Sequence, residues 1–233
     1  MSSLVIPSAA NSGPLPGELT RATTPAGVLV VFAHGAGAGQ HSPFMRRFAA
    51  LLAARGLDVL TFDFPYLAAG RKLPDRAPIL EAAFHDAVAA GVAAFDGAAR
   101  AVVVAGKSMG GRMATHLAAQ PEAWRAAVPL AAAVAFGYPL RPPGPRGGDR
   151  VSHLARLSVP TLIVQGTRDT FGGPDEVTAA TTGAPRVTVL PVATGDHSLK
   201  VTAASGQRQD AVEASIAEAV ARFVRDAASV PPA

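Results

Sequence analysis

The sequence predicts an α/β protein with a mostly parallel, doubly wound sheet and helices on both faces. Short Val-rich segments alternate with helix-length segments from Gly27 onward. The short segments are apolar at nearly every position, as strands covered on both faces are. The chain has 233 residues, of which 49% are hydrophobic and 16% charged. This length and composition are typical of one globular domain with a sizeable core.

The expected elements alternate along the chain. Strands are predicted at 28–33, 58–62, 101–105, 127–134, 161–165 and 187–191, and helices at 43–55, 79–95, 109–119, 175–182 and 209–227. Parallel strands joined by helices require right-handed crossovers. Because sites in such sheets lie beyond the carboxyl ends of the strands, the segments that follow each strand are the ones expected to carry function.

Two segments fall outside this alternation. Residues 1–17 are rich in Ser, Pro and Gly, and they are predicted to form an extended lead-in, with a short edge strand at residues 4–6. A single domain is expected over 18–233. Residues 138–149 are too rich in Pro and Gly for a helix or strand, and they stand where a lid would be inserted. They are too few for a cap domain, so we expect an open site without one.

Charge and composition indicate a cytoplasmic protein without a nucleic-acid or membrane partner. The net charge is +4, but the basic residues are scattered, with no block of like charge. No apolar run approaches the roughly 18 residues that span a bilayer. Residues 1–7 lack the basic and apolar regions of a signal peptide. The chain has no cysteine, which excludes disulfides and thiolate nucleophiles. The sequence does not indicate the oligomeric state.

The segment Gly106-Lys107-Ser108-Met109-Gly110-Gly111 lies between a predicted strand and a predicted helix. This context favours a nucleophile elbow, in which a sharp turn presents Ser108 above the sheet edge. Gly106 and Gly110 are expected because a Cβ at either position would collide with neighbouring backbone. The alternative is an ordinary strand-to-helix turn with Ser108 as a cap. Lys107 could face substrate or solvent.

A serine nucleophile needs a base and a carboxylate that orients the base. His197 is the histidine that follows the last predicted strand, and Asp169 directly follows the strand before it. The chain order Ser108, Asp169, His197 is the order expected for this kind of elbow. Asp196 is the rival carboxylate, but a direct neighbour of His197 is poorly placed to bond its Nδ1. Asp169 could also simply cap a turn.

The oxyanion hole needs two backbone N–H donors. Met109, next after the nucleophile, is the first candidate. The second is expected in the small-residue loop 34–40, where we select Ala36, with Gly37 as the alternative. This loop lacks the glycine spacing of nucleotide-binding motifs.

Aromatic residues after the strands could line a substrate pocket. Tyr66, Tyr138 and Phe171 are the candidates, although aromatic residues at such positions are as often packing residues. Asp63 is interpreted as bracing its loop, and Phe44 and Met45 as core.

On these residues the chain resembles the α/β-hydrolase superfamily over residues 18–228. The segments 33–39 and 106–110 are similar to a small lidless branch whose bacterial members are called predicted hydrolases of the dienelactone-hydrolase type. That branch is also similar to the hydrolase-like subunit of a eukaryotic histone-acetyltransferase-associated complex. The resemblance implies an α/β-hydrolase fold with a Ser108, Asp169 and His197 triad, and no defined substrate. Ser108 departs from the Cys of dienelactone hydrolases and from the Asp of haloalkane dehalogenases.

The predicted function is that of a carboxylesterase-like serine hydrolase acting on small acyl esters, without a metal or cofactor. Its expected partner is a small-molecule acyl substrate. Two alternatives remain at this point: a catalytically silent, hydrolase-like interaction protein, which the resemblance suggests, and an acyltransferase that uses the same triad. Labelling by a fluorophosphonate probe would separate the first from the hydrolase, and analysis of products with alcohol or amine acceptors would separate the second.

Overall fold

A computed structural model describes residues 1–8, 13–95, 97–141 and 149–229. Their strands form one eight-stranded sheet in the order β1-β2-β4-β3-β5-β6-β7-β8. The strands are β1 (Ser2–Ile6), β2 (Leu15–Thr20), β3 (Val28–Ala33), β4 (Asp58–Phe62), β5 (Ala101–Lys107), β6 (Leu130–Phe136), β7 (Thr161–Gly166) and β8 (Val187–Val192). Strands β3 to β8 pair in parallel, whereas β2 pairs antiparallel with both β1 and β4. The predicted fold class is confirmed.

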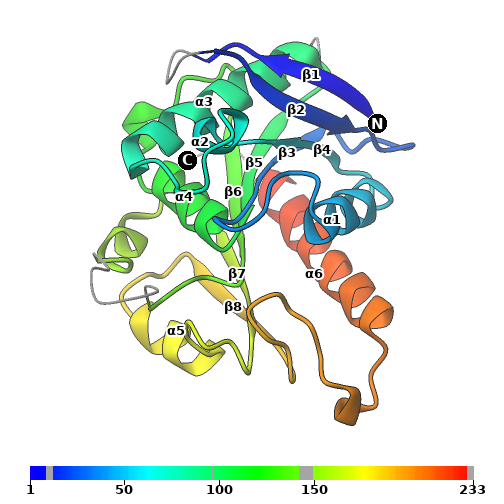
Figure 1. The fold of residues 1–233 in the computed structure, drawn as a ribbon, viewed down its shortest axis with the longest axis vertical. Coiled ribbons are helices and arrows are strands. Elements are labelled where there is room, and N and C mark those ends of the chain that lie inside the picture. The colour runs from blue at the N-terminus through cyan, green and yellow to red at the C-terminus, as the bar shows by residue number, and fades with distance from the viewer. Residues whose placement is uncertain (9–12, 96, 142–148, 230–233) are drawn as a thin grey trace.

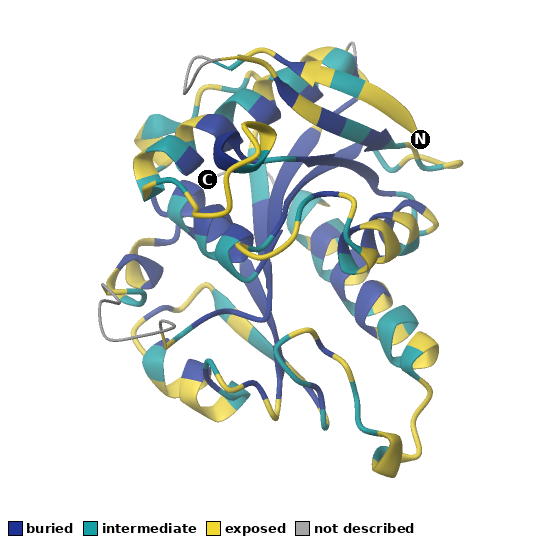
Figure 2. Ribbon diagram, in the orientation of Figure 1, coloured by how far each residue is buried: buried dark blue, intermediate teal, exposed yellow. Residues whose placement is uncertain are grey.

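Helices cover both faces of the sheet (Figure 1). The α-helices are α1 (Pro43–Ala53), α2 (Pro65–Ala68), α3 (Ala77–Ala94), α4 (Met109–Ala118), α5 (Pro174–Ala180) and α6 (Gln209–Ser229). Helices α1 and α6 pack on one face, where Phe48 and Val220 meet Phe32 of β3 in one buried cluster. Helices α2 to α5 pack on the other face, where Phe84 and Met113 belong to a second cluster. The central strands are buried between these layers (Figure 2).

The N-terminal segment contains the predicted edge strand at residues 4–6 as part of β1, but the rest of the segment differs from its prediction. The expected boundary between residues 17 and 18 falls inside β2, and both β1 and β2 belong to the same sheet as the rest of the chain. Pro16 and Gly17 hid this strand from the sequence analysis. Gly17 lies in a tightly packed position, because a Cβ would come within 2.9 Å of Ile6 Cδ1 and 3.3 Å of the Thr61 carbonyl oxygen.

Strand β6 begins later than predicted, at Leu130. Pro129 lacks an N–H for the ladder, although its carbonyl accepts a hydrogen bond from Val102 N at 2.9 Å. The preceding alanines have little preference that distinguishes strand from loop. The other predicted elements lie within two residues of the observed ends.

Helix α3 is long and apolar enough, by length and composition, to cross a membrane, which the sequence analysis did not anticipate. In this structure it is a layer of the fold: Leu80, Phe84 and Val88 are buried in the core cluster. The described residues contain no cap domain over the carboxyl edge of the sheet. Most of the Pro/Gly-rich segment, 142–148, lies outside the described residues.

Candidate active site

Ser108 lies between the end of β5 and the start of α4, in the conformation expected of an elbow. Its φ of 51° and ψ of −112° are unfavourable for an L-residue. The Ser108 N–H donates to the Phe136 carbonyl at 2.9 Å, which ties the turn to the neighbouring strand β6. Ser108 thus projects at the carboxyl edge of the central strands.

The glycines around Ser108 are required by the close approach of backbone segments. A Cβ on Gly106 would lie 2.1 Å from the carbonyl carbon of Gly110. A Cβ on Gly110 would lie 2.4 Å from the Ala33 carbonyl oxygen of β3. Gly111, which the sequence analysis did not interpret, would place a Cβ 2.8 Å from the Gly106 oxygen. The steric reason for Gly106 and Gly110 is confirmed.

The structure brings Ser108, His197 and Asp169 into one hydrogen-bonded line. His197 Nε2 lies 2.9 Å from Ser108 Oγ, and His197 Nδ1 lies 2.8 Å from Asp169 Oδ2. The Asp169 side chain is fully buried, and the His197 ring packs edge-on against Phe171, with ring centroids 4.5 Å apart. This geometry requires Nδ1 to carry the proton that Asp169 accepts, which leaves Nε2 to accept from Ser108 Oγ.

Gln165, at the end of β7, was missed by the sequence analysis. It is fully buried, and its Nε2 donates to Asp169 Oδ2 at 2.9 Å and to the Gly172 carbonyl at 2.6 Å. Asp169 Oδ1 accepts from Phe171 N at 2.8 Å. The carboxylate is therefore held by three groups, counting His197. A polar side chain ending an otherwise apolar strand was the available signal.

Asp196 has a different partner set. Its Oδ1 accepts hydrogen bonds from Ser198 N at 2.7 Å and from Lys200 N at 3.0 Å. The carboxylate thus caps the turn that carries His197. Hydrogen bonding in the structure places Asp169, and not Asp196, against the imidazole.

The loop after β3 faces Ser108 across a cavity of about 590 Å³. Ala36, Gly37, Ser108 and Met109 all line this cavity. Among the hydrogen bonds of the described residues, none occupies the N–H of Ala36 or of Met109. Both candidate oxyanion donors therefore lie at the cavity that holds the serine.

Buried polar groups hold this loop in place. His34 Nδ1 donates to the Gly35 carbonyl at 2.7 Å, and its Nε2 accepts from Phe64 N at 3.0 Å. Desolvation by burial lowers the pKa of His34, which favours the neutral ring that these two bonds require. Asp63 Oδ1 accepts from Gln40 N at 2.8 Å, which confirms that Asp63 braces the loop.

Two of the three aromatic candidates do not line the cavity. Tyr66 and Tyr138 are completely buried, so the prediction that they contact substrate is wrong. The Tyr66 hydroxyl donates to the Ala36 carbonyl at 3.0 Å, and burial raises its pKa to about 12. The Tyr138 hydroxyl donates to the Arg150 carbonyl. Both rings lie in the core, because α2 and the turn after β6 place them beneath the loops to which their hydroxyl groups donate hydrogen bonds.

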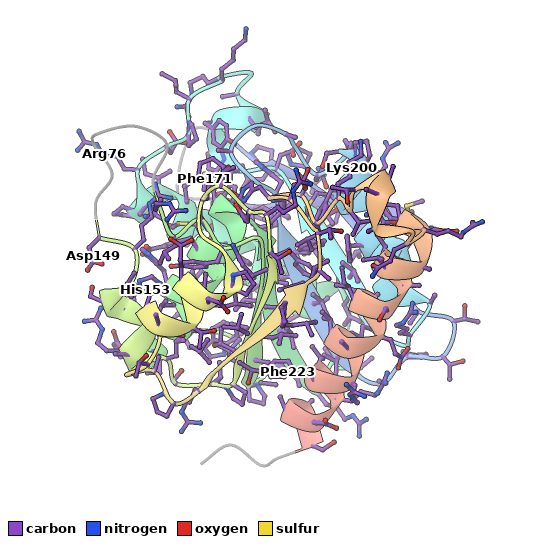
Figure 3. The ribbon with its side chains drawn as sticks, turned by 90° about the horizontal axis from the view of Figure 1, so that it is seen from below. Arg76, Asp149, His153, Phe171, Lys200 and Phe223 are labelled. Carbon is purple, nitrogen blue, oxygen red and sulfur yellow. The ribbon has the colours of Figure 1, made fainter. Side chains whose placement is uncertain are left out.

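Phe171 lines the cavity, as predicted, and Phe44 does so as well, although it was interpreted as core. Figure 3 shows Phe171 in the upper half of the view and Phe223 of α6 in the lower half. Met45 is 1% exposed and belongs to the core, although it also borders the cavity.

Lys107, whose direction the sequence left open, is buried and lines the cavity. Its Nζ donates to the backbone carbonyl of His197 and lies 5.6 Å from the centre of the Phe44 ring. Burial lowers the pKa of Lys107 to about 8, against the opposing influence of Asp169 and Asp196. The ammonium therefore helps to hold the loop that presents the imidazole.

His153, which follows the Pro/Gly-rich segment, is not part of the line of Ser108, His197 and Asp169. Its Nε2 lies 2.9 Å from Thr115 Oγ1, and its ring packs against His116 with centroids 4.2 Å apart. Burial lowers the pKa of His153 to about 4. Figure 3 shows His153 on the side of Asp149, away from Lys200. Within the described ranges, no cluster of three or more His, Asp or Glu side chains could hold a metal ion.

The fold is similar to that of several solved hydrolases. A lidless α/β serine hydrolase from Xanthomonas campestris superposes with a TM-score of 0.72 and 17% identity, covering 95% of this chain and 94% of the other. A dienelactone hydrolase from Anabaena variabilis gives a TM-score of 0.70 and 20% identity, covering 95% of both chains. An α/β serine hydrolase homologue from Coxiella burnetii gives a TM-score of 0.70 and 16% identity, covering 95% of this chain and 96% of the other. At these identities the likeness shows the fold.

Comparison with curated proteins found no significant match. The family described as the alpha/beta hydrolase domain matches residues 26–225, which is most of the chain. The expected resemblance to α/β hydrolases is confirmed, and the chain belongs to the alpha/beta hydrolase domain family.

Proposed function

We propose that this protein is a carboxylesterase-like serine hydrolase that cleaves small, accessible acyl esters through an acyl-enzyme on Ser108. The observation that carries the proposal is the hydrogen-bonded line from Ser108 Oγ through His197 to Asp169, at 2.9 Å and 2.8 Å. The serine end of this line opens into the cavity, and the carboxylate end is buried. Such a line activates a serine hydroxyl that would otherwise be a weak nucleophile.

In the first half-reaction, Ser108 Oγ attacks the ester carbonyl while His197 Nε2 takes its proton. The N–H groups of Met109 and Ala36 stabilise the resulting oxyanion, and the start of α4 adds the positive end of its dipole. When the tetrahedral intermediate collapses, the bond to the alcohol oxygen breaks and His197 returns the proton to that oxygen. Asp169 stabilises the imidazolium between these steps.

In the second half-reaction, a water molecule attacks the acyl-enzyme carbonyl while His197 takes one of its protons. Collapse of the second intermediate releases the acid and returns the proton to Ser108 Oγ. Side chains, backbone amides and water supply every group that these two half-reactions need. Transfer to an alcohol or amine in place of water would follow the same steps, so only the products distinguish hydrolase from acyltransferase.

A fluorophosphonate probe tests the nucleophile. The wild-type protein is expected to form one covalent adduct, and mass spectrometry of its peptides should locate the adduct on Ser108. Ser108→Ala should remain unlabelled. An adduct on another residue would overturn the assignment, and the absence of both labelling and ester cleavage would favour a catalytically silent interaction protein. Free acid as the main product in the presence of alcohol and amine acceptors supports hydrolysis.

The size of the cavity supports small substrates. Its volume of about 590 Å³ is shared by the acyl and alcohol parts of an ester, and the described residues provide no cap over it. A long chain would leave its distal methylenes in water, where each forfeits about 0.8 kcal/mol of burial. Rates over p-nitrophenyl esters from acetate to palmitate should therefore be greatest at short chains. A maximum at palmitate would contradict this part of the proposal.

A further inference from the structure

The cavity wall carries more positive than negative charge. Lys107, Arg112 and Arg150 line it, whereas Asp75 is the one carboxylate among its described lining residues. Asp75 is already bonded by Arg71, through contacts of 2.7 Å and 3.0 Å. The charge of the wall is therefore not balanced from within the cavity.

The two arginines lack carboxylate partners in the described part of the chain. Neither Arg112 nor Arg150 belongs to any ion pair there. Arg150 Nη1 donates to the Pro139 carbonyl at 3.1 Å, and the buried Arg150 Nε has no hydrogen-bond partner. Glu81 is close enough to feel the charge of Arg112, but its carboxylate bonds His116 Nδ1 at 2.7 Å.

The two guanidinium groups also repel each other. Desolvation lowers the pKa of Arg150 first, and the charge of Arg112 lowers it further. Two like charges held near each other beside a partly desolvated cavity are offset best by an anion between them. A planar guanidinium matches a carboxylate in particular, because it can donate two parallel hydrogen bonds.

Arg112 lies four residues after Ser108, on the helix that begins at the nucleophile. Four helical residues rise about 6 Å, so an anion at Arg112 would sit a few bonds from a carbonyl on Ser108 Oγ. We propose that the cavity selects esters whose acyl part carries a carboxylate, which Arg112 and Arg150 bind while Ser108 attacks the ester carbonyl. This inference rests on the proposed hydrolase function and names its substrate class: monoesters of short dicarboxylic acids.

The test compares monoethyl glutarate with ethyl glutaramate, in which an amide of the same shape replaces the carboxylate. Ethanol release gives kcat/KM for each ester. The wild-type protein should prefer the charged ester by about 10- to 100-fold, the range expected for hydrogen bonds to a charged group. Succinate and adipate monoesters then show which spacing between the two carbonyl groups fits best.

Variants assign the preference to the arginines. In Arg112→Gln and in Arg150→Gln, the ratio of charged to neutral kcat/KM should fall by about tenfold or more. Arg222→Gln is the matched control, because it removes the same charge from an exposed position on α6 outside the cavity. Its ratio should equal that of the wild type. An unchanged ratio in both cavity variants would overturn the proposal.

Binding separates this inference from the proposed function. Calorimetry on Ser108→Ala measures the affinity for each ester without turnover. Preferential binding of the charged ester, with no turnover by the wild type, would keep the anion site and overturn the hydrolase. Ester cleavage by the wild type with no preference in rate or binding would keep the hydrolase and overturn the anion site.

Discussion

Ser108 Oγ and His197 Nε2 lie 2.9 Å apart, but different interactions hold the two residues in place. The nucleophile side is fixed by steric contact between backbone segments. Gly106 lies against Gly110, and Gly110 lies against the end of β3, so closely that a Cβ on either glycine would not fit. The base side is fixed by hydrogen bonds between distant segments. Lys107 donates a hydrogen bond to the carbonyl of His197, which lies 90 positions later in the chain. Asp169 accepts a hydrogen bond from the ring of His197, which lies 28 positions later.

This difference predicts which property, stability or activity, a substitution on each side reduces. A steric turn has little tolerance for an added atom, so its substitutions should reduce folding stability. A hydrogen-bonded network can lose one member and keep its fold, so its substitutions should reduce activity more than stability. Five changes test this contrast, from the largest expected effect to the smallest.

Removing the nucleophile should have the largest effect. Ser108→Ala is expected to lower kcat by about 10⁶-fold, as is typical when a serine nucleophile is lost. Ser108→Gly should lose the same activity but be more stable than Ser108→Ala by about 1 kcal/mol, because glycine adopts the strained φ of 51° without a Cβ. Ester hydrolysis and urea denaturation measure the two effects. A less stable glycine variant would show that the elbow holds no strain.

Asp169→Asn should lower kcat by about 10⁴-fold, since an amide favours the wrong tautomer of His197. Asp196→Asn, on the loop after β8 that carries His197, is the control, because its Oδ1 bonds the turn amides of Ser198 and Lys200 and not the imidazole. It should change kcat far less. If Asp196→Asn proves the more damaging change, the structure's assignment of the acid is wrong.

Gln165→Leu should lower kcat by about tenfold, because Asp169 loses one of its donors and the Gly172 carbonyl loses its partner. The shift should appear in kcat more than in KM, as expected for a positioning residue. The exposed Gln207 provides a control, since Gln207→Leu should change neither constant. An unchanged kcat in Gln165→Leu would remove Gln165 from the network that holds the acid.

Gly110→Ala tests the steric side. A Cβ 2.4 Å from the Ala33 oxygen must displace backbone, which should lower the free energy of unfolding by about 1–3 kcal/mol or more. Gly183→Ala is the matched control, because nothing lies within 4 Å of its Cβ position. It should change stability by less than about 1 kcal/mol. Equal effects in the two variants, measured by urea denaturation, would contradict the steric account.

Lys107 links the two sides, and it should make the free energy of unfolding depend on pH. Burial lowers its pKa from 10.5 to about 8 in the folded protein. Between these values the unfolded chain holds more protons on Lys107 than the folded one, so its contribution makes the free energy of unfolding rise with pH. The difference between wild-type and Lys107→Met unfolding curves from pH 7 to 10.5 isolates this term. A flat difference would show that Lys107 is not desolvated.

The elbow motif and the alternation of strands and helices along the chain were predictable because local sequence pattern indicates them. Strands β3 and β4 match their predicted bounds. Short apolar runs between glycines and helical segments are typical of buried strands. The elbow was recognised because its glycines and serine lie within six positions. Strand β2 was missed because Pro16 and Gly17 oppose strand formation locally, and only pairing with β1 and β4 outweighs them.

The sequence by itself determined the fold class, the elbow and the chain order of Ser108, Asp169 and His197. Only the tertiary structure decided which aromatic residues reach the cavity, how Gln165 holds Asp169, and which arginines line the cavity. The physical reason is the distance along the chain over which each kind of interaction acts. Strand, helix and turn preferences act over a few residues, whereas burial and hydrogen bonding at the site join loops that folding alone brings together. Tyr66 and Phe171 both follow strands, yet one supports the Ala36 loop from the core and the other packs on His197.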